Sequence, residues 1–244
     1  MLKNSEFFNQ LADDYNVMID FENSLKNKIA TLTNLCSIND RYALDLGCGT
    51  GTDSIALSKI GLKVDAVDHS KEMLVEAIKN SKIFDTKINF IHTGLTEFTT
   101  RNKTYDIIVS LGNTIANLNG KELKYLFIKL FEYLSKNGKI VIQIINYTKL
   151  PSSGIYILNT FENDSVSILR KYNIKPKSID FIIDKIDKGN NKRSQIITKL
   201  YPHSEDDFKR LANETGFKMK SYGNLNKALF VAKESPNLVV VLTK

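Results

Sequence analysis

The sequence predicts an α/β fold in which a parallel sheet is interrupted late in the chain by an antiparallel insertion. Short apolar runs alternate with helix-length stretches between residues 42 and 145, which is typical of β-α-β units around a parallel sheet. Residues 154–201 lack a helical period and carry three β-rich runs, the last two flanking the turn sequence KGNN. A helical pattern returns at residues 204–216. The insertion therefore divides the α/β pattern into a long first part and a short last part.

Each element of the first part follows from its apolar spacing. Residues 5–35 show helical spacing, which predicts one or two helices ahead of the first strand. The strands DIIVSL and KIVIQII, with their continuous apolar runs, suit the middle of a sheet that is covered on both faces. The expected elements are strands at 42–49, 63–68, 88–94, 105–111 and 138–145, and helices at 52–60, 70–80 and 120–135.

The last part of the chain contains a helix with clear end signals. Ser204 is a good N-cap residue, with Asp207 three residues later in a variant of the capping box, and Gly216 can end the helix in the left-handed conformation. Two further strands are expected at 217–223 and 237–244.

The composition is that of a globular protein. With 244 residues, 42% of them hydrophobic, the chain can bury a substantial core. No apolar stretch is long enough for a signal peptide or for the roughly 20 residues of a membrane span, so we expect a soluble, cytoplasmic protein. Cys36 and Cys48 are too few and too widely spaced for a disulfide framework or a cysteine-based zinc site, so no metal is suggested. The net charge of +7 comes from scattered lysines mixed with acids, which disfavours a nucleic-acid partner.

The sequence ALDLGCGTG places three glycines, Gly47, Gly49 and Gly51, at the carboxyl end of the first strand, just before a helix. Open parallel sheets bind ligands at this edge, and absent Cβ atoms let a ligand approach the main chain. The spacing is G-x-G-x-G rather than the G-x-G-x-x-G of dinucleotide folds, and Asp45 stands just ahead of it. Because an acid there would repel a pyrophosphate, the loop suits a ligand with an ammonium group, bound through the loop or an ordered water.

A second acid, Asp68, ends the next strand, KVDAVD. A carboxylate at this strand tip can accept hydrogen bonds from ribose hydroxyls, so the loop and the acid together imply an adenosine ligand. The alternative is that the glycines only form a tight turn and that Asp68 caps the helix starting at Ser70.

With these motifs the chain resembles the class I S-adenosylmethionine-dependent methyltransferases over essentially its whole length, and more narrowly the glycine N-methyltransferase group. The similar blocks, in order, are GTDSIALSKIGLKVDAVDHSKEML, SLGNTIANL, INY and LYPHSEDDF. The resemblance implies a Rossmann-like, seven-stranded, mostly parallel sheet with its last pair of strands reversed. It also implies that the antiparallel β insertion forms a lid over the substrate.

The resemblance also divides the chain and assigns its cofactor. The cofactor is S-adenosyl-L-methionine, with S-adenosyl-L-homocysteine as the product. The expected division is an N-terminal helical cap at 1–38, the S-adenosylmethionine-binding core at 39–150, the lid at 151–202 and the C-terminal part of the core at 203–244. By position, Gly47, Gly49 and Gly51 would line the cofactor, Asp68 would hold the ribose, Gly94 and Leu95 would contact adenine, and Leu111 would lie near the methyl group. A polar side chain that is more usual at the adenine position is missing.

Three residues are expected on the substrate side. Asn113 falls where the group uses an asparagine at the substrate, and Tyr201 where it uses a lid tyrosine. Tyr15 lies in the N-terminal helical segment, where related methyltransferases often bring a tyrosine to the sulfonium. An equally good reading of Tyr15 is the buried face of an amphipathic helix.

One position departs from the glycine enzymes. They hold the substrate carboxylate with an arginine just before the NY pair, and this chain has Ile145 there. An isoleucine cannot bind a carboxylate, so a cation would have to enter from elsewhere for glycine to be the substrate.

The predicted function is S-adenosylmethionine-dependent methyl transfer to a small molecule, at nitrogen, under the lid. An amine acceptor need only be bound neutral, whereas a hydroxyl acceptor needs a base within hydrogen-bond reach. His203 either faces the substrate or, as the simpler alternative, only caps the start of the following helix. The alternatives are methylation of tRNA or protein, or binding of S-adenosylmethionine without catalysis. Neither the membrane nor nucleic acid is an expected partner, and the oligomeric state is open.

Overall fold

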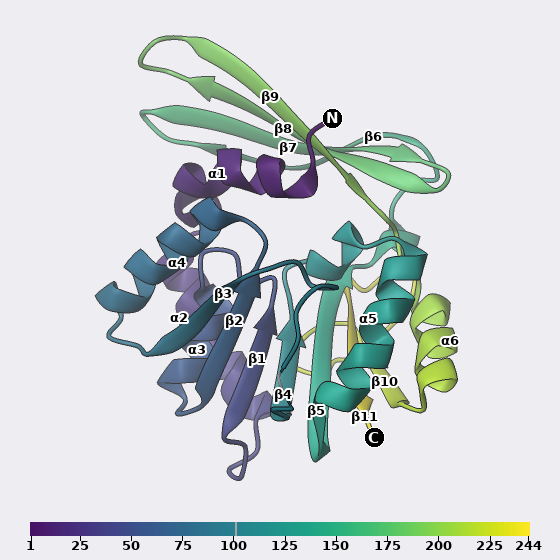
Figure 1. Ribbon diagram of the computed structural model, residues 1–244. Helices are drawn as coiled ribbons and strands as arrows, with labels where there is room; N and C mark the ends of the chain where they lie inside the picture. The colour runs from purple at the N-terminus through teal and green to yellow at the C-terminus, as the bar shows by residue number, and fades with distance from the viewer. Residues whose placement is uncertain (101) are drawn as a thin grey trace.

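The computed structural model describes residues 1–100 and 102–244 and contains two separate sheets (Figure 1). The larger one has seven strands in the order β10-β11-β5-β4-β1-β2-β3. Its strands are β1 (Tyr42–Leu46), β2 (Lys63–Asp68), β3 (Ile88–His92), β4 (Tyr105–Ser110), β5 (Leu134–Ile145), β10 (Lys218–Tyr222) and β11 (Asn237–Thr243). The helices are α1 (Asn4–Met18), α2 (Phe21–Leu35), α3 (Thr52–Lys59), α4 (Lys71–Ile83), α5 (Gly120–Tyr133) and α6 (Glu205–Thr215), with short 3₁₀ turns η1 (Thr114–Asn117) and η2 (Tyr147–Lys149).

The large sheet confirms the predicted fold class. Strands β1 to β5 pair in parallel, whereas β11 is antiparallel to both β5 and β10. The strand order reverses between β1 and β4, so the chain leaves these two strands in opposite directions along the sheet. Ligands of open α/β sheets bind beside such a reversal, at the carboxyl ends of the strands.

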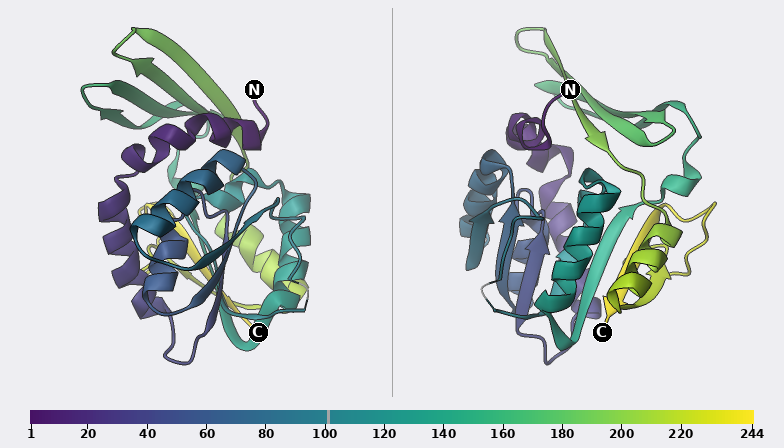
Figure 2. Two further views of the ribbon diagram at one scale, coloured as in Figure 1. Left: turned by 60° about the vertical axis from the view of Figure 1, so that its left-hand side comes forward. Right: turned by 45° about the vertical axis from the view of Figure 1, so that its right-hand side comes forward.

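Helices cover both faces of this sheet (Figure 2), and alternate strand residues enter different cores. On β4, Ile108 packs with α5 and α6, whereas Ile107 and Val109 pack with α2 and α3. On β5, Ile140 and Val141 divide in the same way. This two-residue alternation explains why the strands read as continuous apolar runs, since both faces of each strand are buried.

The second sheet contains β6 (Gly154–Glu162), β7 (Val166–Lys175), β8 (Ser178–Asp187) and β9 (Lys192–Leu200), paired antiparallel in that order. It lies above the carboxyl edge of the large sheet, as Figure 1 shows. The first predicted β-rich run, 154–173, forms two strands rather than one. The turn between them is stabilised by Asn163, whose Oδ1 accepts hydrogen bonds from the N–H groups of Ser165 and Val166 at 2.9 and 2.8 Å.

The N-terminal helical segment divides at Asp20, which has a left-handed φ of 50°. Helix α2 packs on the large sheet beside α3, whereas α1 lies between the two sheets (Figure 1). The main chain just before α1 is bound to the second sheet, because the N–H of Leu2 donates to the carbonyl of Ile197 at 2.9 Å. The expected 1–38 segment is thus two helices with different surroundings.

The element boundaries differ slightly from the predicted ones. Helix α4 continues to Ile83, and β5 begins directly at Leu134, where α5 ends. Within the described residues, 1–100 and 102–244, every helix is too short or too polar to cross a bilayer.

The predicted cap of α6 is confirmed and gives a test of local stability. The Ser204 hydroxyl oxygen accepts the Asp207 N–H at 3.2 Å, and the Ser204 N–H donates to Asp207 Oδ2 at 2.9 Å. Replacing Ser204 with alanine leaves the Asp207 N–H without its acceptor, so we expect the free energy of unfolding to fall by about 1 kcal/mol. Urea denaturation measures this change. The control is Asn213→Ala, an exposed position of the same helix, which should cause no loss.

Candidate active site

A cavity of about 430 Å³ lies between the carboxyl edge of the large sheet and the second sheet. Its floor comes from the residues that follow β1, β2, β3 and β4, together with Ile145 at the end of β5. One wall is α1, with Phe8 and Tyr15, and the roof comes from β6 to β9. The cavity therefore gathers residues from nearly the whole length of the chain.

Two of the predicted glycines form part of the floor. Gly47 and Gly49 line the cavity with left-handed φ values of 79° and 54°. A Cβ on Gly47 would stand 2.2 Å from Cγ2 of Thr114, so no larger residue fits without moving η1. The loop is consequently bare main chain on its cavity side.

Asp68 holds this loop in place. One carboxylate oxygen accepts the Gly49 N–H at 2.8 Å, and the other accepts the Ser70 N–H at 2.9 Å. The predicted alternative, in which Asp68 caps this helix, is wrong, because Ser70 is the N-cap of α4 and Asp68 only accepts the N–H of that capping residue. A carboxylate has about four acceptor sites, and the backbone uses two, which leaves capacity for two ligand hydroxyls on the cavity side.

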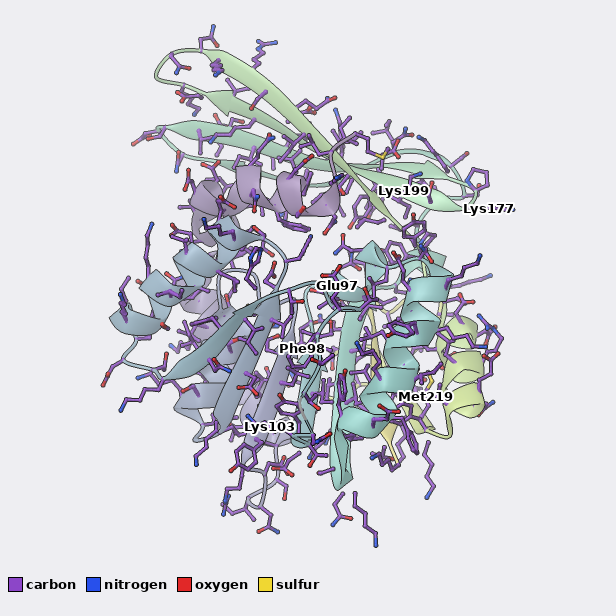
Figure 3. All side chains as sticks on the ribbon, in the orientation of Figure 1. Glu97, Phe98, Lys103, Lys177, Lys199 and Met219 are labelled. Atoms are coloured by element: carbon purple, nitrogen blue, oxygen red, sulfur yellow. The ribbon has the colours of Figure 1, made fainter. Side chains whose placement is uncertain are left out.

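The residues after β3 form the next part of the floor. Gly94 and Leu95 line the cavity, and so does the hydroxyl-bearing Thr96, which supplies a polar side chain that the sequence analysis missed. The turn is shaped by the Gly94 carbonyl, which accepts the N–H groups of Glu97 and Phe98 at 3.1 and 3.0 Å. Figure 3 shows Glu97 at this edge of the large sheet, below the second sheet.

Three predicted cofactor residues do not line the cavity. Gly51 begins α3 in the left-handed conformation and faces α4, since its Cβ would lie 3.2 Å from Ala77 Cβ. Asp45 is buried behind the loop and accepts a hydrogen bond from the Ser54 hydroxyl at 2.5 Å, and desolvation raises the pKa of its carboxyl. Leu111 is buried in the core beneath α2 and α3.

Gly112, the residue after Leu111, reaches the cavity instead. Gly112 lines the cavity with a φ of 64°, and nothing lies within 4 Å of the position that its Cβ would occupy. Its signal in the sequence was a glycine directly after an apolar strand, the same signal that identified Gly47.

Asn113 reaches the cavity with a fixed side-chain orientation. Its Oδ1 accepts the Ile145 N–H at 3.1 Å and the Tyr147 hydroxyl at 3.0 Å. Because a backbone N–H can only donate, Oδ1 must face Ile145, and Nδ2 is left as a donor without a partner among residues 1–100 and 102–244. The predicted substrate residue thus presents two N–H hydrogens from a rigid amide.

Tyr15 belongs to both the interior of the protein and the cavity. It packs beside the buried face of α1 and also lines the cavity, where its ring would lie 3.8 Å from a Cβ on Gly49. Burial is the main cause that raises the pKa of its hydroxyl. The ring therefore covers the glycine loop with a neutral phenol.

Two other candidates are not brought to the cavity. Tyr201 follows β9 where the chain leaves the second sheet, and its N–H donates to the Ala116 carbonyl at 2.7 Å. His203 is buried against Phe208, and its Nε2 lies 2.8 Å from the Leu118 carbonyl oxygen. Burial lowers the pKa of His203, as expected for an imidazole that packs inside the protein. The geometry supports neither as a catalytic residue.

The second sheet contributes residues that the sequence analysis did not select for the site. Arg170 and Tyr172 of β7 and Asn159 of β6 line the roof. Arg170 Nε donates to Asn159 Oδ1 at 2.6 Å. The sequence does indicate that Arg170 and Tyr172 lie on one face of a strand, because side chains alternate between faces every residue. It does not indicate which face of the strand meets the cavity.

Comparison with known proteins agrees with this geometry. Residues 43–138 match the family model described as a methyltransferase domain. The chain is 24% identical over 209 residues to a glycine/sarcosine N-methyltransferase of Aphanothece halophytica, covering 84% of this chain and 76% of that protein.

Two solved structures share the complete fold. An S-adenosylmethionine-dependent methyltransferase from Clostridium acetobutylicum superposes with a TM-score of 0.82 and 18% identity, covering 97% of this chain and 98% of that one. The CcbJ methyltransferase from Streptomyces caelestis gives a TM-score of 0.83 and 18% identity, covering 100% and 99%.

The fold, the glycine loop and these similarities define an S-adenosylmethionine-dependent methyltransferase. Residues 43–138 form a methyltransferase domain, the chain has the fold of the class I enzymes, and its cofactor is S-adenosyl-L-methionine. Over most of its length it is similar to the glycine/sarcosine N-methyltransferase named above. The cavity fits this cofactor, since bare main chain at Gly49 and Gly112, a carboxylate at Asp68 and an apolar side chain at Leu95 meet along one floor.

We expect Asp68 to be needed for cofactor affinity. In Asp68→Asn one of the two backbone N–H groups would face an amide NH₂ instead of an acceptor, and the ribose would lose a charged acceptor. Hydrogen bonds to charged groups are worth enough to predict a roughly 10- to 100-fold weaker Kd for S-adenosylhomocysteine, measured by calorimetry. The matched control is Asp53→Asn, which removes an acid of α3 that pairs with Lys28 outside the cavity and should change Kd less than threefold.

Proposed function

We propose that this enzyme methylates the nitrogen of a small amine that is enclosed between the large sheet and the second sheet. The observation that carries the proposal is the chemistry of the cavity's acceptor side, where neutral donors and buried phenols surround Asn113. We further propose that 39–150 and 203–244 form the cofactor-binding core, that 1–38 forms a cap, and that 151–202 acts as the lid.

The covered position of the cavity supports a small acceptor. Helix α1 lies over the cavity and is tied to both sides of it. Asn9 Oδ1 accepts the Ser70 hydroxyl at 2.6 Å at the core, and Asn4 Nδ2 donates to Thr198 Oγ1 at 3.3 Å in the second sheet. A tRNA or a folded protein would have to displace these contacts, whereas a metabolite of a few heavy atoms would not.

The ionisation of the lining residues Tyr15 and Tyr172, and of Tyr147 behind Asn113, favours nitrogen over oxygen as the methylated atom. Burial raises the pKa of Tyr15, Tyr147 and Tyr172, so these hydroxyls stay protonated at neutral pH and cannot accept a proton from an alcohol. His69 lies on the ribose side, with Nδ1 3.4 Å from Asp68 Oδ1. An amine that binds in its neutral form needs no protein base, because it already carries the attacking lone pair.

The residues then have distinct roles in the proposed reaction. When bound, the cofactor supplies a methyl group on a positively charged sulfur, which makes the group open to in-line attack. Tyr15 covers the glycine loop, excludes water there and accepts an N–H of the amine, so that the lone pair is aimed at the methyl group. Asn113 Nδ2 donates to an oxygen of the acceptor. The similarity to a glycine/sarcosine N-methyltransferase supports an amine as the acceptor.

The function is tested by following S-adenosylhomocysteine formation with purified protein and S-adenosylmethionine. We expect turnover with small primary or secondary amines, rising with pH until the amine is fully neutral, and none with alcohols of matched size. Mass spectrometry of the product locates the methyl group. Turnover confined to alcohols, or to a ribosomal or peptide substrate, would refute the proposal.

The roles of Asn113 and Tyr15 are tested by Asn113→Ala and Tyr15→Phe. We expect kcat/KM for the amine to fall about 10- to 100-fold in each, as for the loss of one or two positioned hydrogen bonds. The Kd of S-adenosylhomocysteine should change less than threefold. Tyr125→Phe, which removes an exposed hydroxyl of α5, is the control and should leave both constants unchanged. An equal loss of cofactor affinity in Asn113→Ala would place Asn113 at the cofactor instead.

A further inference from the structure

The cavity contains one strong cation, Arg170, that has no acidic partner in the part of the chain that the structure describes. Among the described lining residues, Asp68 is the carboxylate and Arg170 is the side chain that keeps a full positive charge at neutral pH. No Asp or Glu of residues 1–100 and 102–244 lies within ion-pair distance of Arg170, although its neighbour Lys171 pairs with Asp184 at 2.5 Å. Arg170 is half-buried, and burial lowers its pKa. A cation held in this way is stabilised by an anion that enters the cavity.

An irregularity of the second sheet orients Arg170. Tyr156 lies opposite Tyr172, and Asn159 lies opposite Arg170. Between these two pairs β6 advances by three residues and β7 by only two, so β6 contains one extra residue. This β-bulge turns Asn159 to the same face as Arg170, where its Oδ1 accepts the Nε hydrogen at 2.6 Å. With Nε occupied, the two terminal nitrogens remain as donors, and they form one edge of a planar fork that matches a carboxylate.

Arg170 belongs to the acceptor side of the cavity. Tyr172 is two residues further along β7, about 7 Å away on the same face. Tyr172 packs in one cluster with Tyr147 and Ile145, and Tyr147 donates to Oδ1 of Asn113 at 3.0 Å. These contacts connect β7 in the roof with Asn113 and Ile145 in the floor. Ile145 contributes only an apolar side chain to the lining.

We propose that Arg170 is the specificity-determining residue of this enzyme and binds a carboxylate of the methyl acceptor. The inference rests on the proposed function and specifies its substrate class: a small molecule that carries both an amine and a carboxylate. Arg170 and Asn113 Nδ2 hold the carboxylate, and the amine then lies between them and the glycine loop, under Tyr15. The charge that Ile145 cannot supply from the large sheet is thus supplied from the second sheet.

The other carboxylate that Arg170 could bind is that of the cofactor itself. It is disfavoured because Arg170 is held by Asn159 on the second sheet and lies beside Tyr172, whereas the cofactor-facing groups Asp68 and Gly49 lie on the floor. Binding and turnover measurements on the same variants separate the two sources.

The experiment compares glycine and β-alanine with their amides, glycinamide and β-alaninamide, as acceptors for four proteins. These are the wild type, Arg170→Gln, Arg170→Lys and the control Lys171→Gln, which removes the adjacent cation on the opposite face of β7. We expect the wild type to prefer the acids. Arg170→Gln should raise KM for the acids about 10- to 100-fold while leaving KM for the amides within threefold. Arg170→Lys should be intermediate, and Lys171→Gln should behave as the wild type.

A second measurement needs no turnover and so separates this inference from the proposed function. Acetate, compared with acetamide at equal ionic strength, should raise the Tm of the wild-type complex with S-adenosylhomocysteine, and Arg170→Gln should abolish the difference. This result would support the carboxylate site even if no amine were methylated.

Three results would overturn the inference. The first is equal stabilisation of the wild type by acetate and acetamide. The second is an acid preference that survives in Arg170→Gln. The third is a tenfold or greater loss of S-adenosylhomocysteine affinity in Arg170→Gln with unchanged acid preference, which would assign Arg170 to the cofactor's carboxylate.

Discussion

The carboxylate of Asp68 is the interaction on which the site depends. It joins the ends of two parallel strands, because it stands at the tip of β2 and accepts the N–H of Gly49 in the loop after β1. It also accepts the N–H of Ser70, whose hydroxyl donates to Asn9 of α1. A single buried acid thus fixes the glycine loop, the start of α4 and the helix that covers the cavity. Such a charge is tolerated because backbone N–H groups replace the water that it loses.

Helix α1 connects the core around the large sheet with the second sheet. Its polar side chains reach the core at one end and the second sheet at the other, and Lys185 of β8 pairs with Asp14 of the helix. Its apolar face packs against Phe181 and Ile183 of the second sheet. A movement of the second sheet that admits substrate would therefore also move Tyr15. In the proposed reaction, closure over the substrate and placement of the phenol over the glycine loop occur in one motion.

The floor of the cavity is suited to the cofactor, and the roof is suited to the methyl acceptor. The floor presents bare main chain and one carboxylate, which suit a cofactor that is the same in every reaction of this enzyme class. The roof presents the cation of Arg170, the phenol of Tyr172 and the amide of Asn159, held by strand pairing and by the bulge in β6. Acceptor selectivity can therefore change with a few side chains of β6 and β7, because these strands belong to a different sheet from the residues that face the cofactor.

What the sequence by itself determined are the features in which neighbouring residues decide the structure. The βαβ pattern, the tight turns at Gly47 and Gly49, the cap at Ser204 and the acid at the end of β2 each follow from short-range spacing, and the large sheet has the predicted order of elements. An adenosine ligand follows from the same local features, since strand, loop and acid lie within about thirty residues, and the resemblance to class I methyltransferases specifies it as S-adenosylmethionine.

Only the tertiary structure decided which side chains face one cavity. Gly51 and Asp45 belong to the same motif as Gly49, yet packing against α4 and burial behind the loop keep them from the lining. Gly112 rather than Leu111 reaches the cavity, and Tyr201 does not, because strand ends and turns set the direction of each residue. Arg170 was not predictable, since its position needs the pairing register of β6 with β7 and the placement of the second sheet. Contacts between residues far apart in the chain depend on packing, which no local spacing encodes.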